Sequence, residues 1–336
     1  MSSGVTQIVA TGAQDDFIVG NPEVSFFSSV YKRHTNFAHV LYRQVIQGNP
    51  SKGGMSTVRF EKKADLLAYV YLVRKDLADI DPNEIEYVEF LIGGQVIDRQ
   101  YYDFSVNIAD KLLTTSQNKA SGTHGTAFYP LHFWFCEAWS SALPLVSLQG
   151  HDVEIRITWG SGVSPSTQYE CWCNYIALDT VERVKLASPE AKHILMYQTQ
   201  RQPLSGASIQ PLILNQPVKF LACSSDILND TDTIRLQLNG SDIGDEKVYG
   251  QHCTVIPNYY HCTNQSSFDT FLHPFCLETS KVQGSGAVNF SRLDSARFVS
   301  TNGGLFGGSS PTGFIYAVNY NVLKIERGLG GLLYAN

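Results

Sequence analysis

A strict alternation of polar and apolar residues runs through Asp152-Val153-Glu154-Ile155-Arg156-Ile157-Thr158-Trp159. This period of two is typical of a β-strand with one face in a core and the other in water. The alternation recurs in Thr233 to Asn239 and in Thr57 to Glu61. The sequence therefore predicts several half-buried strands.

Two longer segments, Leu66 to Val73 and Ile315 to Val322, are apolar or aromatic on both faces. This pattern predicts strands that are covered on both sides. Between the strands, Gly93-Gly94 and Asn239-Gly240 can adopt the positive φ angles that two-residue hairpins need. The turns indicate antiparallel neighbours.

Helical periodicity is scarce and is confined to three short segments: Ser25 to Tyr31, Asp103 to Leu113 and Ser188 to Tyr197. Many short strands with few helices predict an all-β protein of the sandwich or jelly-roll type.

The length of 336 residues corresponds to about two domains at roughly 150 residues each. Three echoes of sequence keep the same order and lie about 140 to 146 residues apart, which suggests an internal duplication. The join is expected in the polar stretch from Leu186 to Lys192. The echoes pair Gly94 with Gly240, Phe128–Phe133 with Phe271–Phe275, and Tyr175–Leu178 with Ile315–Val318.

The charge balance of 25 basic and 31 acidic residues gives a net charge of −6, and the first basic residue is Lys32. Phosphate binding needs clustered Lys and Arg, so direct nucleic-acid binding is not expected. Charged residues make up 17% of the chain, below the usual share of about 25%, which indicates that much of the surface faces other protein. No apolar run reaches the roughly 20 residues of a spanning helix, and no secretory signal is expected at the start.

The seven cysteines are an odd number at irregular spacings, which favours a reducing compartment over a disulfide framework. Cys171 and Cys173 would lie on one face of a strand, as core residues. The second half contains His252-Cys253, His261-Cys262 and His273-Pro274-Phe275-Cys276. If these lie on strands, neighbouring residues point to opposite faces, and no zinc spacing is present. We therefore expect no metal site.

Signatures of enzymes are also missing from the sequence. It contains no Gly-x4-Gly-Lys-Ser/Thr phosphate loop and no Gly-x-Ser-x-Gly nucleophile motif. His151-Asp152 could suggest a general base, but no partner Ser or Cys can be placed beside it. The expectation is a protein without catalytic residues, cofactor or metal. Asn-x-Ser/Thr triplets occur at Asn229, Asn239, Asn264 and Asn289. Their glycosylation stays open and is not expected without a secretory signal.

Blocks at both ends and in both halves of the chain resemble one protein family. The segments are Thr11–Phe17, Gly20–Phe27 and Val30–Phe37 near the start, Pro130–Cys136 and Leu143–Val153 in the first half, and Leu236–Gly240, Gly286–Asp294 and Tyr316–Leu323 in the second. They resemble the major capsid proteins of nucleocytoplasmic large DNA viruses, in particular those of phycodnaviruses and mimivirus relatives.

This resemblance implies a double jelly roll, that is, two eight-stranded jelly-roll sandwiches in tandem with a few short helices. The implied domains are an N-terminal arm or base segment (1–36), a first jelly roll (37–187) and a second jelly roll (188–336). It further implies a structural protein that forms homotrimers, which are pseudo-hexameric capsomers tiling an icosahedral shell around an internal membrane and a double-stranded DNA genome. Neighbouring capsomers and minor capsid proteins at the inner face would be the partners. The chain would belong to the virion, after assembly in the host cytoplasm.

Two alternatives remain open. The chain could be a minor capsid paralogue, or it could be a carbohydrate-binding or attachment jelly roll. In the second case, aromatic residues such as Tyr129, Tyr259 and Tyr260 would stack on sugars. Leu329, Leu332, Leu333 and Tyr334 are expected to pack against the first unit or a neighbouring chain.

Overall fold

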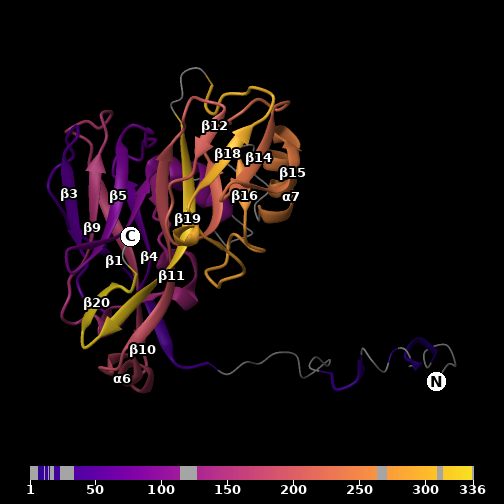
Figure 1. The fold of residues 1–336 in the computed structure, drawn as a ribbon. Helices are drawn as coiled ribbons and strands as arrows, with labels where there is room; N and C mark the ends of the chain where they lie inside the picture. Colours follow the sequence, from indigo (N-terminus) through magenta and orange to yellow (C-terminus); the bar gives the residue numbers. More distant parts are fainter. Residues whose placement is uncertain are drawn as a thin grey trace. The chain divides into compact units, whose positions relative to one another are not determined.

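The computed structural model of the chain describes residues 7–10, 12–13, 15, 19–22, 34–113, 127–262, 271–308 and 313–334. Its contacts divide the chain into two compact units, Met1–Asn36 and Phe37–Asn336. The larger unit consists of two antiparallel β-sandwiches that follow one another in sequence (Figure 1). The predicted double jelly-roll class is therefore confirmed, whereas the helix predicted over Ser25 to Tyr31 lies outside the described residues.

The first sandwich contains two five-stranded sheets, which we name A and B. Sheet A comprises β1 (Phe37–Gln44), β4 (Leu66–Arg74), β7 (Phe128–Pro130), β8 (Leu143–Pro144) and β10 (Tyr169–Leu178). Sheet B comprises β2 (Ile46–Gln47), β3 (Met55–Arg59), β5 (Ile85–Ile92), β6 (Gln95–Tyr101) and β9 (Val153–Trp159).

The second sandwich contains a six-stranded sheet C and a four-stranded sheet D. Sheet C comprises β11 (Lys192–Pro203), β13 (Pro217–Cys223), β16 (Leu272–Pro274), β17 (Val288–Asn289), β19 (Phe314–Glu326) and β20 (Leu329–Leu332). Sheet D comprises β12 (Ile209–Pro211), β14 (Thr233–Leu238), β15 (Ser241–Val248) and β18 (Ala296–Ser300).

The order of strands is repeated between the two sandwiches. Sheet A runs β1-β10-β4-β7 and sheet C runs β11-β19-β13-β16, while β9-β5-β6 in sheet B matches β18-β14-β15 in sheet D. All three sequence echoes fall on matching elements: the β5–β6 and β14–β15 hairpins, the short strands β7 and β16, and the central strands β10 and β19. The predicted internal duplication is confirmed.

The predicted strands and hairpins are largely confirmed. β9 and β14 alternate between buried and more exposed residues, and the hairpin residues Gly93, Gly94, Asn239 and Gly240 all have positive φ. β19 is buried on both faces from Ile315 to Asn321. For β4, however, coverage on both sides is wrong, because Tyr69 on the outer face is 43% exposed.

Helices differ more from the sequence prediction. A continuous helical segment over α3 (Tyr102–Phe104), η1 (Ser105–Ala109) and α4 (Asp110–Leu112) confirms the predicted helix over Asp103 to Leu113. The helix predicted over Ser188 to Tyr197 is wrong, since β11 begins at Lys192 and pairs with β19 along its whole length. A helix instead precedes it, α6 (Thr180–Ala187). A further helix that the sequence reading missed comprises η4 (Gly250–Val255) and α7 (Ile256–His261).

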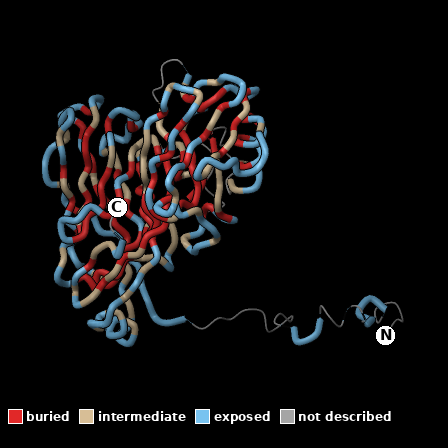
Figure 2. Tube along the Cα trace, in the orientation of Figure 1, coloured by how far each residue is buried: buried red, intermediate tan, exposed pale blue. Residues whose placement is uncertain are grey.

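Two hydrophobic cores run along the sandwiches (Figure 2). The smaller core fills the space between sheets C and D. The larger core fills the first sandwich and continues into the second through the outer face of sheet C, where Phe220, Tyr316 and Val318 belong to it. The two sandwiches are thus joined by buried apolar surface.

The C-terminal strand β20 ties the second sandwich to the first. The Gly150 N–H donates to the Gly328 carbonyl at 2.9 Å, and the Gly330 N–H donates to His151 Nδ1 at 3.2 Å. Leu332 packs against the larger core. The expected packing against the first unit is therefore confirmed for Leu332, whereas Leu329, Leu333 and Tyr334 are exposed. His151 serves the contact of β20 with the first sandwich.

Gly330 gives a direct test of this contact. A Cβ at this position would lie 2.5 Å from Leu148 Cδ2 and 3.3 Å from Ile92 Cγ2, so Gly330→Ala must displace β20. We expect a loss of about 1–3 kcal/mol in the free energy of unfolding, as for other overpacked sites, measured by urea denaturation. Gly284→Ala is the control, because no heavy atom lies within 4 Å of its Cβ position. Equal stability of the two variants would contradict the role of β20.

Candidate assembly surfaces

The polar part of the junction between the sandwiches lies between β6 of the first and β11 of the second. The Thr199 N–H donates to Asp98 Oδ1 at 2.8 Å, and Gln198 Nε2 donates to the Ile97 carbonyl. The Tyr197 hydroxyl donates to the His132 carbonyl at 3.3 Å. Side chains of β11 thus satisfy acceptors on the first sandwich.

The aromatic part of the junction lies beside these hydrogen bonds. Tyr316 on β19 contacts Phe104 and Tyr101, with ring centroids 5.4 and 6.5 Å apart. The Arg201 guanidinium lies 3.8 Å from the ring centre of Tyr101 and 3.3 Å from that of Phe314. The outer face of sheet C is therefore covered by β6 and the helix that follows it.

Asp98 is buried at this junction, and both of its oxygens accept hydrogen bonds, from the Thr199 N–H and from Gln100 Nε2. Burial raises the pKa of its carboxyl from 3.8 to about 7, against the lowering effect of these hydrogen bonds. Between pH 4 and pH 7, the Asp98 carboxyl is therefore protonated in the folded chain and ionised in the unfolded chain.

This difference predicts that stability falls as the pH rises from about 4 to about 7. The contribution of Asp98 is fully present below its unfolded pKa and is lost as the pH passes the folded pKa, by up to about 4 kcal/mol. The slope of the free energy of unfolding against pH, measured by denaturation at several pH values, should be absent in Asp98→Asn and present in the unaltered chain. Asp294→Asn, in the exposed loop before β18 and outside the proposed contact surfaces, should keep the slope. A slope that survives in Asp98→Asn would contradict the assignment.

Strands that match the junction elements by position are left exposed by the described part of the chain. In β6, Ile97, Asp98 and Gln100 are buried, whereas β15 is exposed along almost its whole length. In β11, the residues from Met196 to Gln198 are buried, whereas β1 is exposed from Phe37 to Arg43. The first sandwich therefore has its β6 surface covered and its β1 surface exposed. The second sandwich has its β11 surface covered and its β15 surface exposed.

Both uncovered surfaces include exposed apolar side chains. On the outer face of sheet A, Leu41 and Tyr69 are each 43% exposed and lie near the half-buried Tyr71 and Trp172. On the second sandwich, the helix η4–α7 exposes the stripe Val255, Ile256, Tyr259 and Tyr260, of which Tyr259 is 80% and Tyr260 73% exposed. Exposed apolar patches of this kind mark protein–protein contacts.

The histidines and cysteines of the second half are arranged differently from the expectation of strands. His252, Cys253 and His261 lie on the helix η4–α7, and only His273 lies on a strand, β16. Burial between Phe275 and Phe298 lowers the pKa of His273 to about 4. In the described part of the chain, no three His, Cys, Asp or Glu residues are grouped so that they could hold a metal ion.

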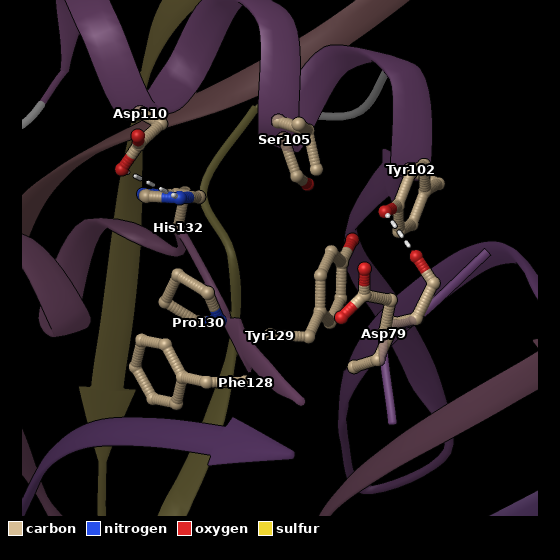
Figure 3. A pocket seen from close by; sticks show the side chains of 10 residues that line it. Asp79, Tyr102, Ser105, Asp110, Phe128, Tyr129, Pro130 and His132 are labelled. Carbon is tan, nitrogen blue, oxygen red and sulfur yellow. Dashed lines mark hydrogen bonds and ion pairs between the residues drawn. The ribbon is translucent and has the colours of Figure 1, made fainter. Parts of the chain in front are cut away.

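A cavity of about 220 Å³ in the first sandwich was the best remaining candidate for chemistry (Figure 3). His132 lies at its wall, with Nδ1 2.6 Å from Glu137 Oε1 and Nε2 4.0 Å from Asp110 Oδ1. Tyr102 and Tyr129 stack beside it at 5.3 Å, and Ser105 points toward its interior. The His132 imidazole is held between the carboxylates of Glu137 and Asp110. This arrangement stabilises the buried histidine side chain and does not pair it with a nucleophile.

The other residues singled out in the sequence have structural positions. Cys171 and Cys173 are buried core residues, as predicted. Tyr129 is buried, so its proposed use for stacking on sugars is wrong. Among the glycosylation triplets, Asn229 and Asn289 form hydrogen bonds within turns. Asn239 Oδ1 instead accepts from the N–H of the distant Asp294, and Asn264 lies outside the described residues.

Within the described ranges, no helix combines the length and apolar character that crossing a membrane requires.

Comparison with known proteins gives matches over the whole chain. The sequence model of the family "Major capsid protein N-terminus" matches residues 25–179. The major capsid protein of Pyramimonas orientalis virus is 32% identical over 403 residues, and that of Paramecium bursaria Chlorella virus 1 is 27% identical over 438 residues. Both matches cover 100% of this chain and of the relative.

Solved structures agree in fold. The PBCV-1 virus capsid matches with a TM-score of 0.75 at 24% identity, covering 93% of this chain and 100% of that chain. The major capsid protein P2 of bacteriophage PM2 matches with a TM-score of 0.54 at 11% identity, covering 89% and 99%. This chain is a structural component of the virion and not an enzyme, and it belongs to the family of major capsid proteins of large DNA viruses.

Proposed function

We propose that three copies of this chain associate into a pseudo-hexameric capsomer, the unit from which an icosahedral shell is tiled. The observation that carries the proposal is the pair of uncovered surfaces. Sheet A of one copy would lie against β15 and the helix η4–α7 of the next copy, as sheet C lies against β6 and its helix within one chain.

The two surfaces differ from each other, so the contact runs head to tail. Such contacts close into a ring when the rotation per copy divides a full turn. If the contact between chains repeats the contact between the two sandwiches of one chain, each sandwich is rotated by about 60° relative to its neighbour. Three copies then close a ring of six sandwiches.

Charge supports this pairing of surfaces. Strand β15 carries Asp242, Asp245 and Glu246, all exposed. The opposing strand β1 carries His39 and Arg43, which are also exposed. Within the chain, Arg43 pairs with Glu170, and Asp242 and Glu246 pair with Arg235, so contacts between copies would add to these ion pairs. Opposite charges on facing edges favour the correct register and the rate of association.

The solution mass tests the oligomer directly. A trimer would have three times 37.3 kDa, about 112 kDa, by light scattering. A strictly monomeric species at high concentration would contradict the proposal, and so would a stable dimer, which leaves the ring open.

We further propose that the chain is organised as the arm 1–36, the jelly roll 37–187 and the jelly roll 188–336, and that the arm serves shell formation at the inner face. Neighbouring capsomers and minor capsid proteins would be its partners during assembly in the host cytoplasm, with the internal membrane nearby and without direct contact to nucleic acid. Deletion of residues 1–20 should leave trimers intact but impair shells, as seen by electron microscopy. Normal shells from the truncated chain would refute the role of the arm.

A further inference from the structure

An open crevice of about 720 Å³ lies between the two sandwiches, next to the junction described above. Its walls come from the start of β5 and the loop before it, the end of β6 with the helix α3–η1, the loop after β9, Arg201 on β11, the residues after β13 and the start of β19. The crevice lies at the end of the first sandwich where β9 ends and β10 begins. The helix α6 lies at the other end, where β10 ends. A volume of several hundred Å³ is typical of sites for small ligands.

Arg201 is the one basic side chain among the residues that line the crevice. Its guanidinium is fixed between the rings of Tyr101 and Phe314, and its Nε is buried without a hydrogen-bond partner. Among the described residues, no carboxylate forms an ion pair with it. The buried Nε is not accessible to a ligand, but the two rings fix the orientation of the guanidinium at the wall of the crevice, where it suits a ligand that accepts hydrogen bonds.

Asp103 supplies the complementary acceptor. Its Oδ1 accepts from Asn107 Nδ2 at 2.8 Å, and its Oδ2 accepts from the Ser224 hydroxyl at 2.6 Å and the Tyr316 hydroxyl at 3.2 Å. A carboxylate has about four acceptor positions, so one remains for a ligand hydroxyl. Three neighbours hold the carboxylate in place before any ligand arrives.

We propose that this crevice binds a saccharide through its vicinal hydroxyl groups. A hydroxyl group both donates and accepts, so a pair of hydroxyls can use Arg201 and Asp103 at once. Aromatic rings line the same space and offer apolar surface to the C–H face of a sugar ring. The combination of fixed polar groups and aromatic walls separates this crevice from the cavity at His132, which is smaller and more enclosed.

The site is complete within one chain and does not depend on the proposed trimer. Its exposed position between the sandwiches leaves it open to glycans on another surface. Of the aromatic residues first considered for sugar stacking, Tyr259 and Tyr260 lie instead on the helix that we assign to the contact between copies.

Saturation-transfer NMR on the full chain tests the proposal, with methyl glycosides of glucose, galactose, mannose and glucuronic acid as probes. At least one glycoside should give transfer from the protein. Arg201→Gln should weaken binding by about tenfold or more, corresponding to the loss of a charged hydrogen bond. Ser161→Trp should block the crevice from its exposed rim without removing an internal contact.

Ser164→Trp is the matched control, since this exposed serine lies on the same loop but outside the crevice, and it should bind as the unaltered chain does. Transfer to no glycoside would overturn the proposal, as would transfer that Ser161→Trp leaves unchanged. Binding of sulfate alone would also overturn it, because the crevice would then be an anion site. Light scattering on the same samples reports the trimer separately, so the two proposals can fail independently.

Discussion

A chain carrying Ile256→Asp is expected to remain monomeric, at about 37 kDa, under conditions where the unaltered chain forms a species of about 112 kDa. Ile256 lies in the apolar stripe of the helix η4–α7, where it is 42% exposed among the described residues. In the proposed trimer it faces sheet A of the next copy, where a carboxylate would be buried without a partner. That costs several kcal/mol per contact, enough to weaken association by about 100-fold or more. Sedimentation velocity over a range of concentrations measures the change.

Leu77→Asp is the matched control for this variant. Leu77 is at least as exposed as Ile256, but it lies in the loop between β4 and β5, outside both proposed contact surfaces. Its φ of 58° is also one that Asp tolerates better than Leu, so folding should not suffer. The control should assemble as the unaltered chain does. If both variants form trimers of equal stability, the helix η4–α7 is not part of the interface.

Trp134→Ala is expected to reduce the free energy of unfolding by about 3–5 kcal/mol, the usual cost of truncating a buried aromatic side chain. Trp134 is fully buried in the larger core, where its ring lies 5.4 Å from Phe90 and 5.1 Å from Phe135. The protein around it cannot close over so large a cavity. Urea denaturation followed by circular dichroism measures the effect.

A second tryptophan five residues later provides the comparison. Trp139 is 85% exposed, so Trp139→Ala should change the free energy of unfolding by less than about 0.5 kcal/mol. Similar losses for the two variants would show that the packing at Trp134 is not what stabilises the sandwich. If Trp139→Ala instead changes assembly alone, this exposed ring belongs to a contact between chains.

The strands were predictable because a period of two reports directly on one buried face. β9 shows it from Val153 to Ile157 and β14 from Thr233 to Gln237, and positive-φ glycines mark the hairpins at Gly94 and Gly240. The duplication was predictable for the same reason, because matching turns and strands occupy matching places in the two sandwiches.

The errors concern segments whose structure depends on distant partners. The residues from Lys192 to Tyr197 suit a helix locally, but β19 offers them a continuous strand edge, and tertiary pairing overrides the local preference. The helix η4–α7 was missed because it begins with a π-helical stretch and includes Pro257, and because its apolar stripe from Val255 to Tyr260 is too short to stand out as a helical pattern.

The contact surfaces could not be derived from periodicity at all. Apolar residues on both faces of β4 predict cover on both sides, and the sequence does not say whether the cover comes from the same chain or from another. Only the comparison of β1 with β11, and of β15 with β6, shows which surfaces lack their cover within the chain. The crevice at Arg201 was equally invisible, since its walls come from six separate segments of the sequence.

The two sandwiches share one strand order but carry different side chains, and this has a genetic consequence. A coat made from a single gene product of this design contains two chemically distinct blocks in equal numbers. Selection can alter the surface of one block while the other stays unchanged, a freedom that a coat assembled from identical single-domain copies does not have.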